Sequence, residues 1–207
     1  MEDVSRMKIT DYAILFLTLL FSWTSVYGMY DKAAFQNAKT CEELNQILDN
    51  VTTEALQSGY VGDKGKTPVI NQNQIVDSFI TNLSLMLYGI DGEQEQAKIW
   101  ENIVCMIMIQ GEEYYLCKNG EISEPFLLTG MEHEEKVRAL EQVILQEMKE
   151  CKYKITFPAN SGEKNSQTIS DYAVLTVYVT NRYSFAGEEY AGCVLSGAAI
   201  KEKRNGT

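Results

Sequence analysis

The chain has 207 residues, enough for one compact domain and a terminal segment, and 45% of them are hydrophobic, which argues against a disordered protein. Its formal net charge is −11, from 18 basic and 29 acidic residues, and the only basic cluster lies in the C-terminal tail. Proteins that bind nucleic acid neutralise phosphates with clustered Lys and Arg, so the composition argues against nucleic acid as a partner.

An uncharged apolar run extends from Tyr12 to Tyr30, directly after Asp11. Its length of ~19 residues is close to the ~20 that a helix needs to cross the hydrocarbon core of a bilayer. Arg6 and Lys8 precede the run and favour a cytoplasmic N-terminus. The sequence therefore predicts a single-pass protein of the cell membrane whose C-terminal domain is extracytoplasmic.

A cleaved signal peptide is the alternative for the same run. Val26 and Gly28 occupy the positions where a cleavage site requires small residues. Cleavage after Gly28 would release a secreted domain that begins at Met29, whereas a retained run would anchor the chain.

The segment from Met29 to Ser58 contains no Gly or Pro and predicts a helix that continues the membrane segment. Apolar or small residues recur in it in alternating steps of four and three, which places them on one helical face. The face consists of Tyr30, Ala34, Asn37, Cys41, Leu44, Leu48, Val51 and Ala55. The whole rod, from Tyr12 to Ser58, would be ~70 Å long at 1.5 Å per residue. Two partners are open for its face: the chain's own domain and other subunits.

Residues 59–71 are rich in glycine and predict a linker or a wrap-around loop. After them, a helix is expected from Gln74 to Tyr88, because its apolar residues follow helical spacing. Asparagines precede this helix as candidate N-caps, and Gly89 follows it as the C-cap.

The unbroken apolar run from Ile103 to Ile109 predicts a buried strand, which returns as a second strand from Glu113 to Cys117. The dipeptide Asn119-Gly120 predicts a tight hairpin turn. A third short strand is expected around Ile122 to Leu128.

Five cysteines lie along the chain, and none has the CxxC spacing of a structural zinc site. Cys105 and Cys117 are equidistant from Gly111, so a hairpin centred on that glycine would place the two thiols opposite each other. Two outcomes are open for this pair: a cross-strand disulfide and two buried free thiols.

Residues 131–151 predict an amphipathic helix with an acidic start. A long strand with alternating faces is expected over Ile169–Tyr183, and a last strand over Tyr190–Ile200. These elements predict an α+β fold, in which a long N-terminal helix is followed by an antiparallel-sheet domain with two further helices. The expected division is a transmembrane and amphipathic helical rod over 1–58, a linker over 59–71 and a head domain over 72–207.

No catalytic motif occurs in the sequence. P-loop, GxGxxG, HExxH and GxSxG patterns are absent, and the one histidine, His133, lies in an acidic helix start that favours a surface position. We therefore expect a non-enzymatic protein with no cofactor and no metal site.

A membrane helix that continues as an amphipathic helix into an α+β head resembles the layout of type IV pilin-like proteins. In detailed order the chain resembles the minor pilins and pseudopilins of Tad-type systems in Gram-positive bacteria. The resemblance is carried by "DYAILFL", "AAFQNAKTCEELNQILDNVTTEAL", "QIVDSFITNLSLMLYG" and "ITFPANSGEKNSQTISDYAVLTVYV". It departs from the family at "RMKIT", which lacks the glycine where the prepilin peptidase cleaves.

The resemblance implies a non-enzymatic, membrane-anchored structural subunit of a pilus or secretion apparatus. Its partners would be the membrane and other pilin-like subunits or envelope assembly proteins, which it would contact through the N-terminal helix. The residues assigned to assembly are Asp11, by analogy with the family's acidic residue, and Tyr30, Ala34, Leu44, Leu48 and Val51. The alternative function is a secreted or single-pass binding module whose acidic head captures a protein or a small ligand.

Overall fold

The structure is a computed structural model that describes residues 41–62, 68–156, 171–185 and 188–200, and residues 20, 21 and 24 of the N-terminal segment. The chain divides into two compact units, Met1–Thr40 and Cys41–Thr207, and the fold below is that of the second unit. The predicted membrane segment, with Asp11, Tyr30 and Ala34, lies outside the described residues. Among the residues that are described, no helix is both long enough and apolar enough for a membrane span.

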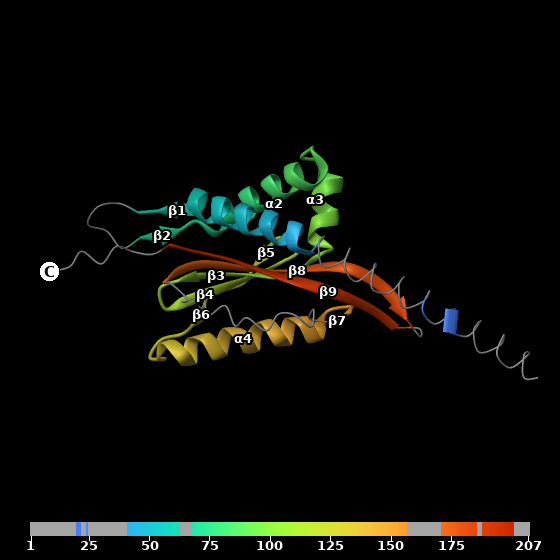
Figure 1. The fold of residues 1–207 in the computed structure, drawn as a ribbon. Coiled ribbons are helices and arrows are strands. Elements are labelled where there is room, and N and C mark those ends of the chain that lie inside the picture. The colour runs from blue at the N-terminus through green and yellow to red at the C-terminus, as the bar shows by residue number, and fades with distance from the viewer. Residues whose placement is uncertain are drawn as a thin grey trace, which may run out of the picture. The chain divides into compact units, whose positions relative to one another are not determined.

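A curled sheet of seven strands forms the centre of this unit (Figure 1). Its strand order is β5-β4-β3-β8-β9-β7, and β6 also pairs with β4. The strands are β3 (Ile103–Gln110), β4 (Glu113–Lys118), β5 (Glu121–Ile122), β6 (Phe126–Leu127), β7 (Lys154–Thr156), β8 (Tyr172–Phe185) and β9 (Glu188–Ile200). All neighbours in the sheet are antiparallel except β7 and β9, which are parallel.

Helices cover both faces of the sheet (Figure 1). Helix 41–59, α2 (Gln72–Tyr88) and α3 (Glu93–Trp100) share one core cluster with strands β3 and β8. On the opposite face, α4 (His133–Glu150) contributes Leu140 and Met148 to two smaller clusters. The predicted α+β fold class is confirmed at this level.

Helix α2 ends where the sequence predicted and begins two residues earlier, at Gln72 instead of Gln74. The side chain of Asn71 accepts a hydrogen bond from the backbone N–H of Gln74 at 3.2 Å, which caps the N-terminus. At the other end, Gly89 has a φ of 75° and its N–H donates to the carbonyl of Leu85 at 2.9 Å. Glycine adopts this left-handed conformation without steric cost, so the helix stops there.

Side chains of β8 alternate between the two core layers, as the sequence predicted. Val174 and Tyr178 belong to the cluster beneath helix 41–59 and α2, whereas Ala173 and Val177 belong to the clusters against α4. Strand β8 is covered on both faces, so residues of both alternate sets are buried, among them the polar Thr176 and Thr180.

The prediction of a purely antiparallel sheet is wrong. After β6 the chain forms α4 on the face of the sheet opposite to helix 41–59 and α2. Strand β7 follows and pairs with β9 at the edge of the sheet farthest from β5. Strand β7 runs in the same direction as β9, with Ile155 opposite Ala191. A strand of three residues is too short for a periodic pattern to indicate its direction.

The prediction of two further helices is also wrong, because α3 is a third. Its eight residues bury only Ile99, so they show no apolar periodicity in the sequence. The predicted strand at 122–128 is divided into β5 and β6 by residues 123–125.

Residues 59–71 form more than a linker. The strands β1 (Tyr60–Val61) and β2 (Val69–Ile70) pair antiparallel within this segment, and Ile70 is 1% exposed in the main core. Residues 41–58, which the sequence assigned to the rod, belong to the same compact unit as the sheet.

Candidate interaction surfaces

The apolar stripe of helix 41–59 packs into the chain's own core. Leu48, Val51 and Ala55 are each 0% exposed there, and Leu44 packs against the same cluster while half-buried. This corrects the assignment of Leu48 and Val51 to a surface that contacts other subunits, since side chains closed off by their own domain have no area left for a partner. The sequence left two partners open for this stripe, and the buried positions pack against the chain's own domain.

A polar cluster joins helix 41–59 to the last strand. Ser196 on β9 donates a hydrogen bond to Oδ1 of Asp49 at 2.8 Å, and its Oγ lies 3.0 Å from Oγ1 of Thr52. Thr52 and Ser196 are buried, at 0% and 1% exposure. Buried hydroxyl groups are costly without partners, so the two satisfy each other and fix the helix on β9.

The C-terminus of helix 41–59 lies tightly against the start of α2. A Cβ atom added at Gly59 would lie 2.3 Å from Cγ1 of Ile75 and 2.9 Å from the carbonyl oxygen of Asn71. The carbonyl of Gly59 also accepts a hydrogen bond from the N–H of Asn71 at 2.8 Å. Only glycine therefore allows the two helices this close an approach.

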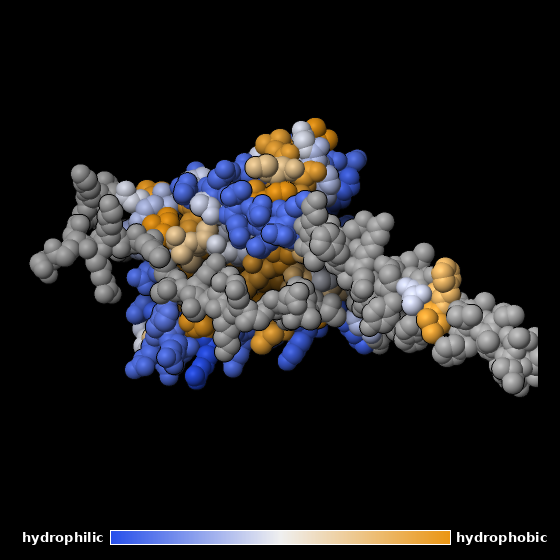
Figure 2. Space-filling model, in the orientation of Figure 1, coloured by the Kyte–Doolittle hydropathy of each residue, from blue (hydrophilic) through white to orange (hydrophobic). Residues whose placement is uncertain are grey.

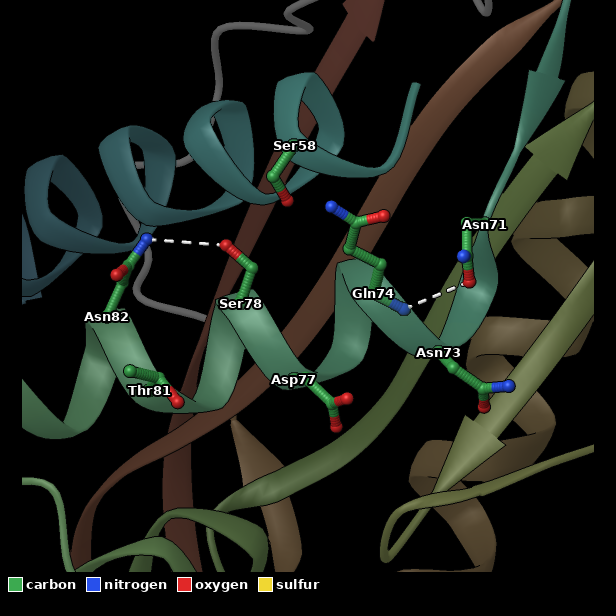
Figure 3. A pocket seen from close by; sticks show the side chains of 8 residues that line it. All are labelled: Ser58, Asn71, Asn73, Gln74, Asp77, Ser78, Thr81 and Asn82. Atoms are coloured by element: carbon green, nitrogen blue, oxygen red, sulfur yellow. Dashed lines mark hydrogen bonds between the residues drawn. The ribbon is translucent and has the colours of Figure 1, made fainter. Parts of the chain in front are cut away.

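A polar groove lies between helix 41–59 and α2 (Figure 3). Its volume is about 510 Å³ and it opens widely to solvent. The lining residues are Ser58, Asn71, Asn73, Gln74, Asp77, Ser78, Thr81 and Asn82. In Figure 3, Ser58 points from helix 41–59 toward the side chains of α2, and the amide of Asn82 donates to Ser78 at 3.5 Å.

The chemistry of this groove is that of neutral hydrogen bonding. Amides and hydroxyls line it and Asp77 is its single charged residue. The amide of Asn82 also donates to Glu54 on helix 41–59, at 3.3 Å, and so links the two walls. Such a lining suits a ligand that is rich in hydroxyl or amide groups and carries no strong charge.

An apolar patch lies at the other end of α2 and its exit turn. We define the α2–α3 patch as Leu85, Met86, Tyr88 and Ile90, which are 48%, 54%, 41% and 57% exposed. Figure 2 shows hydrophobic surface over this corner of the molecule, where α2 ends and α3 begins. Single exposed apolar residues are ordinary on protein surfaces, whereas a contiguous group indicates a binding site.

Cys105 and Cys117 do not form a disulfide, and both thiols are free. Gln110 pairs with Glu113, so the β3–β4 turn has two residues and is not centred on Gly111. Cys117 consequently pairs with Met106, and Cys105 is displaced by one residue onto the opposite face of the sheet. The alternative of two buried free thiols is the one found.

Burial keeps these thiols protonated. It raises the pKa of Cys105 from 9.0 to about 12, with a further rise from the nearby Glu147 carboxylate, and it raises the pKa of Cys117 to about 11. A protonated, buried thiol is a poor nucleophile, so both residues are packing groups.

The remaining candidate for chemistry, His133, lies on the surface as the first residue of α4. In the part of the chain that the structure describes, no three His, Cys, Asp or Glu side chains are close enough to hold a metal ion.

No family model matches the sequence, and no curated protein or solved structure matches it either. The resemblance to pilin-like proteins therefore stays a prediction.

Proposed function

We propose that the chain is a non-enzymatic, membrane-anchored structural subunit of a cell-envelope pilus or secretion apparatus, with a pilin- or pseudopilin-like layout. The proposal combines the apolar run of the sequence with the way in which helix 41–59 is held in the head. The predicted membrane segment ends at Tyr30, and the described part of that helix begins at Cys41.

The observation that carries the proposal is that helix 41–59 is part of the core of the head. Leu48 and Val51 are fully buried and Asp49 is hydrogen-bonded to β9, so the helix cannot swing freely on the domain. A tension applied to an anchor before residue 41 would load the packed core directly. This suits a subunit that bears force, whereas receptors that only capture ligands can hang from flexible linkers.

In this proposal, the residues that remain available for contacts with other subunits are Asp11, Tyr30, Ala34 and the exposed part of Leu44. The experiment compares Asp11→Asn with Asp31→Asn in the full chain, because these two aspartates flank the apolar run at opposite ends. We expect both variants to remain in the membrane fraction, and only Asp11→Asn to lose the high-mass assembly on native gels in mild detergent. Two variants that both assemble like the parent chain would contradict a role for Asp11.

A second candidate function is a binding module, and the polar groove between helix 41–59 and α2 favours it. Its amide and hydroxyl lining would accept a neutral polar ligand such as a short oligosaccharide. The test is a titration with N-acetylglucosamine oligomers, followed by the amide signals of Asn73 and Asn82 in NMR spectra. Saturable shifts of both signals, absent in a Thr81→Val and Ser78→Ala double variant, would favour this function over the first.

A further inference from the structure

A small cavity lies where α4 begins, at the end of the sheet where β3 turns into β4 (Figure 1). We call it the α4 cavity; its apolar lining is Ile109, Leu128 and Met131, and its lining also contains Lys136 and Asp171. Its volume is about 200 Å³. Sites for drug-sized ligands span roughly 300–1,000 Å³, so this cavity is limited to a smaller molecule.

Backbone hydrogen bonds to a single turn hold two walls of the α4 cavity. The N–H of Gly111 donates to the carbonyl of Asp171 at 2.6 Å, and the N–H of Leu128 donates to the carbonyl of Glu112 at 2.7 Å. The turn therefore fixes the residue before β8 and the residue after β6 relative to each other. A site held by such rigid supports is preformed for its ligand.

The two opposite charges of the α4 cavity do not pair with each other or with their neighbours. Among the residues that the structure describes, no carboxylate lies within 4.0 Å of the Lys136 ammonium, and no cation lies within 4.0 Å of the Asp171 carboxylate. Lys136 is half-buried and Asp171 is exposed. Both groups are therefore available to a ligand.

The glutamates at the start of α4 have other partners. Glu132 and Glu135 form a capping box, in which the Glu135 carboxylate accepts a hydrogen bond from the N–H of Glu132 at 3.1 Å. The carboxylate of Glu134 lies 4.0 Å from the guanidinium of Arg138. These contacts explain why three acidic side chains so close in sequence leave Lys136 without an ion pair.

A cation and a carboxylate that share one cavity with apolar side chains are complementary to a small zwitterion. The ammonium group of such a ligand would donate charge-assisted hydrogen bonds to Asp171, and its carboxylate would accept them from Lys136. Its apolar part would pack on Ile109 and Leu128, which are each 2% exposed, and on Met131, which is 40% exposed.

We propose that the α4 cavity binds a free α-amino acid with an apolar side chain. This ligand class combines the ammonium, the carboxylate and the apolar group in a molecule small enough for the cavity. His133 belongs to the same lining and supplies a further N–H donor for the carboxylate. The inference does not rest on the proposed anchorage, because the whole site lies within the head.

The experiment is a calorimetric titration of the full chain in mild detergent with L-leucine, glycine, 3-methylbutanoate and 3-methylbutylamine. We expect leucine to bind saturably. The other three molecules lack the apolar side chain, the ammonium or the carboxylate, and each should bind at least about tenfold more weakly.

Two variants assign the charges. Lys136→Gln and Asp171→Asn should each weaken leucine binding at least about tenfold, since each removes one charge-assisted contact. The control is Lys149→Gln, an exposed lysine in the last turn of α4, which should bind leucine like the parent. Asp171→Asn should also leave the weak binding of 3-methylbutanoate unchanged, and circular dichroism establishes that each variant is folded.

Three results would overturn the inference: a parent chain that shows no saturable binding of leucine, 3-methylbutanoate that binds as tightly as leucine, or leucine binding that neither Lys136→Gln nor Asp171→Asn weakens. The second result would indicate a simple anion site, and the third a site elsewhere on the chain. Membrane fractionation tests the anchored subunit separately, so the two proposals can fail independently.

Discussion

Ser196 on β9 donates a hydrogen bond to Asp49 on helix 41–59 at 2.8 Å, joining two residues that are 147 positions apart in the chain. The same hydroxyl lies 3.0 Å from Thr52 Oγ1. This cluster fixes the helix on the last strand of the sheet, and the proposed function depends on that attachment.

Replacing Ser196 with alanine removes the hydroxyl that bonds to Thr52 and one of the donors to Asp49. The hydroxyl of Thr52 would stay buried without its partner, so we expect Ser196→Ala to lower the free energy of unfolding by about 1–3 kcal/mol in urea titrations. The control is Thr53→Ala on the exposed side of the same helix, which should change stability little. Equal stabilities of Ser196→Ala and the parent would mean that the cluster does not hold the helix.

Truncating Leu48 tests whether the stripe of helix 41–59 belongs to the core. A side chain at 0% exposure leaves a cavity when it is shortened, so Leu48→Ala should cost about 2–5 kcal/mol of unfolding free energy. The matched control is Leu145→Ala on α4, where the leucine is 49% exposed and the expected loss is small. A Leu48→Ala variant with normal stability but no assembly would restore Leu48 as a subunit contact.

Gly59 tests the close approach of helix 41–59 and α2. An added methyl group would lie 2.3 Å from Cγ1 of Ile75, which is itself 0% exposed and has no room to move. Gly59→Ala should therefore destabilise the domain by about 1–3 kcal/mol, measured by thermal unfolding. At Gly92 the added methyl group would meet only the flexible Glu95 carboxylate, so Gly92→Ala should leave the melting temperature nearly unchanged.

Cys105 should contribute to the pH dependence of stability in the alkaline range. Burial raises its pKa in the folded state from 9.0 to about 12, so the folded chain keeps a proton that the unfolded chain loses. The stability from this thiol is fully present below pH 9 and is lost as the pH rises toward 12.

The measurement is urea unfolding between pH 8 and about 11. We expect Cys105→Ala to lose stability less steeply with pH than the parent chain does, whereas Cys151→Ala, at the half-buried end of α4, should follow the parent. Identical slopes for the parent and Cys105→Ala would show that this thiol is not protected by burial.

Local patterns in the sequence predicted the elements that depend on local physics. The asparagine and glycine caps and the apolar spacing of α2 are features of one segment, and the alternation in β8 follows from a strand buried on both faces. Asn119 and Gly120 have φ values of 50° and 83°, as expected for the tight turn that they predict.

Features that depend on distant partners could not be predicted from the sequence. The pairing of Cys117 with Met106 depends on a two-residue turn, and a shift of one residue moved Cys105 to the opposite face. The Asp49–Ser196 hydrogen bond and the parallel pairing of β7 have no local signature. Leu48 and Val51 showed an apolar face in the sequence, but periodicity cannot tell whether such a face packs on its own domain or on another chain.

The most direct test of the anchored subunit is the intact mass and N-terminal sequence of the full chain recovered from its native cell envelope. We expect a membrane-bound chain that retains Tyr12 to Tyr30, beginning near Met1, or near Ile9 if a peptidase matures it. A chain that begins at Met29 and is found outside the membrane would contradict the anchored subunit, because the apolar run would then be a discarded signal.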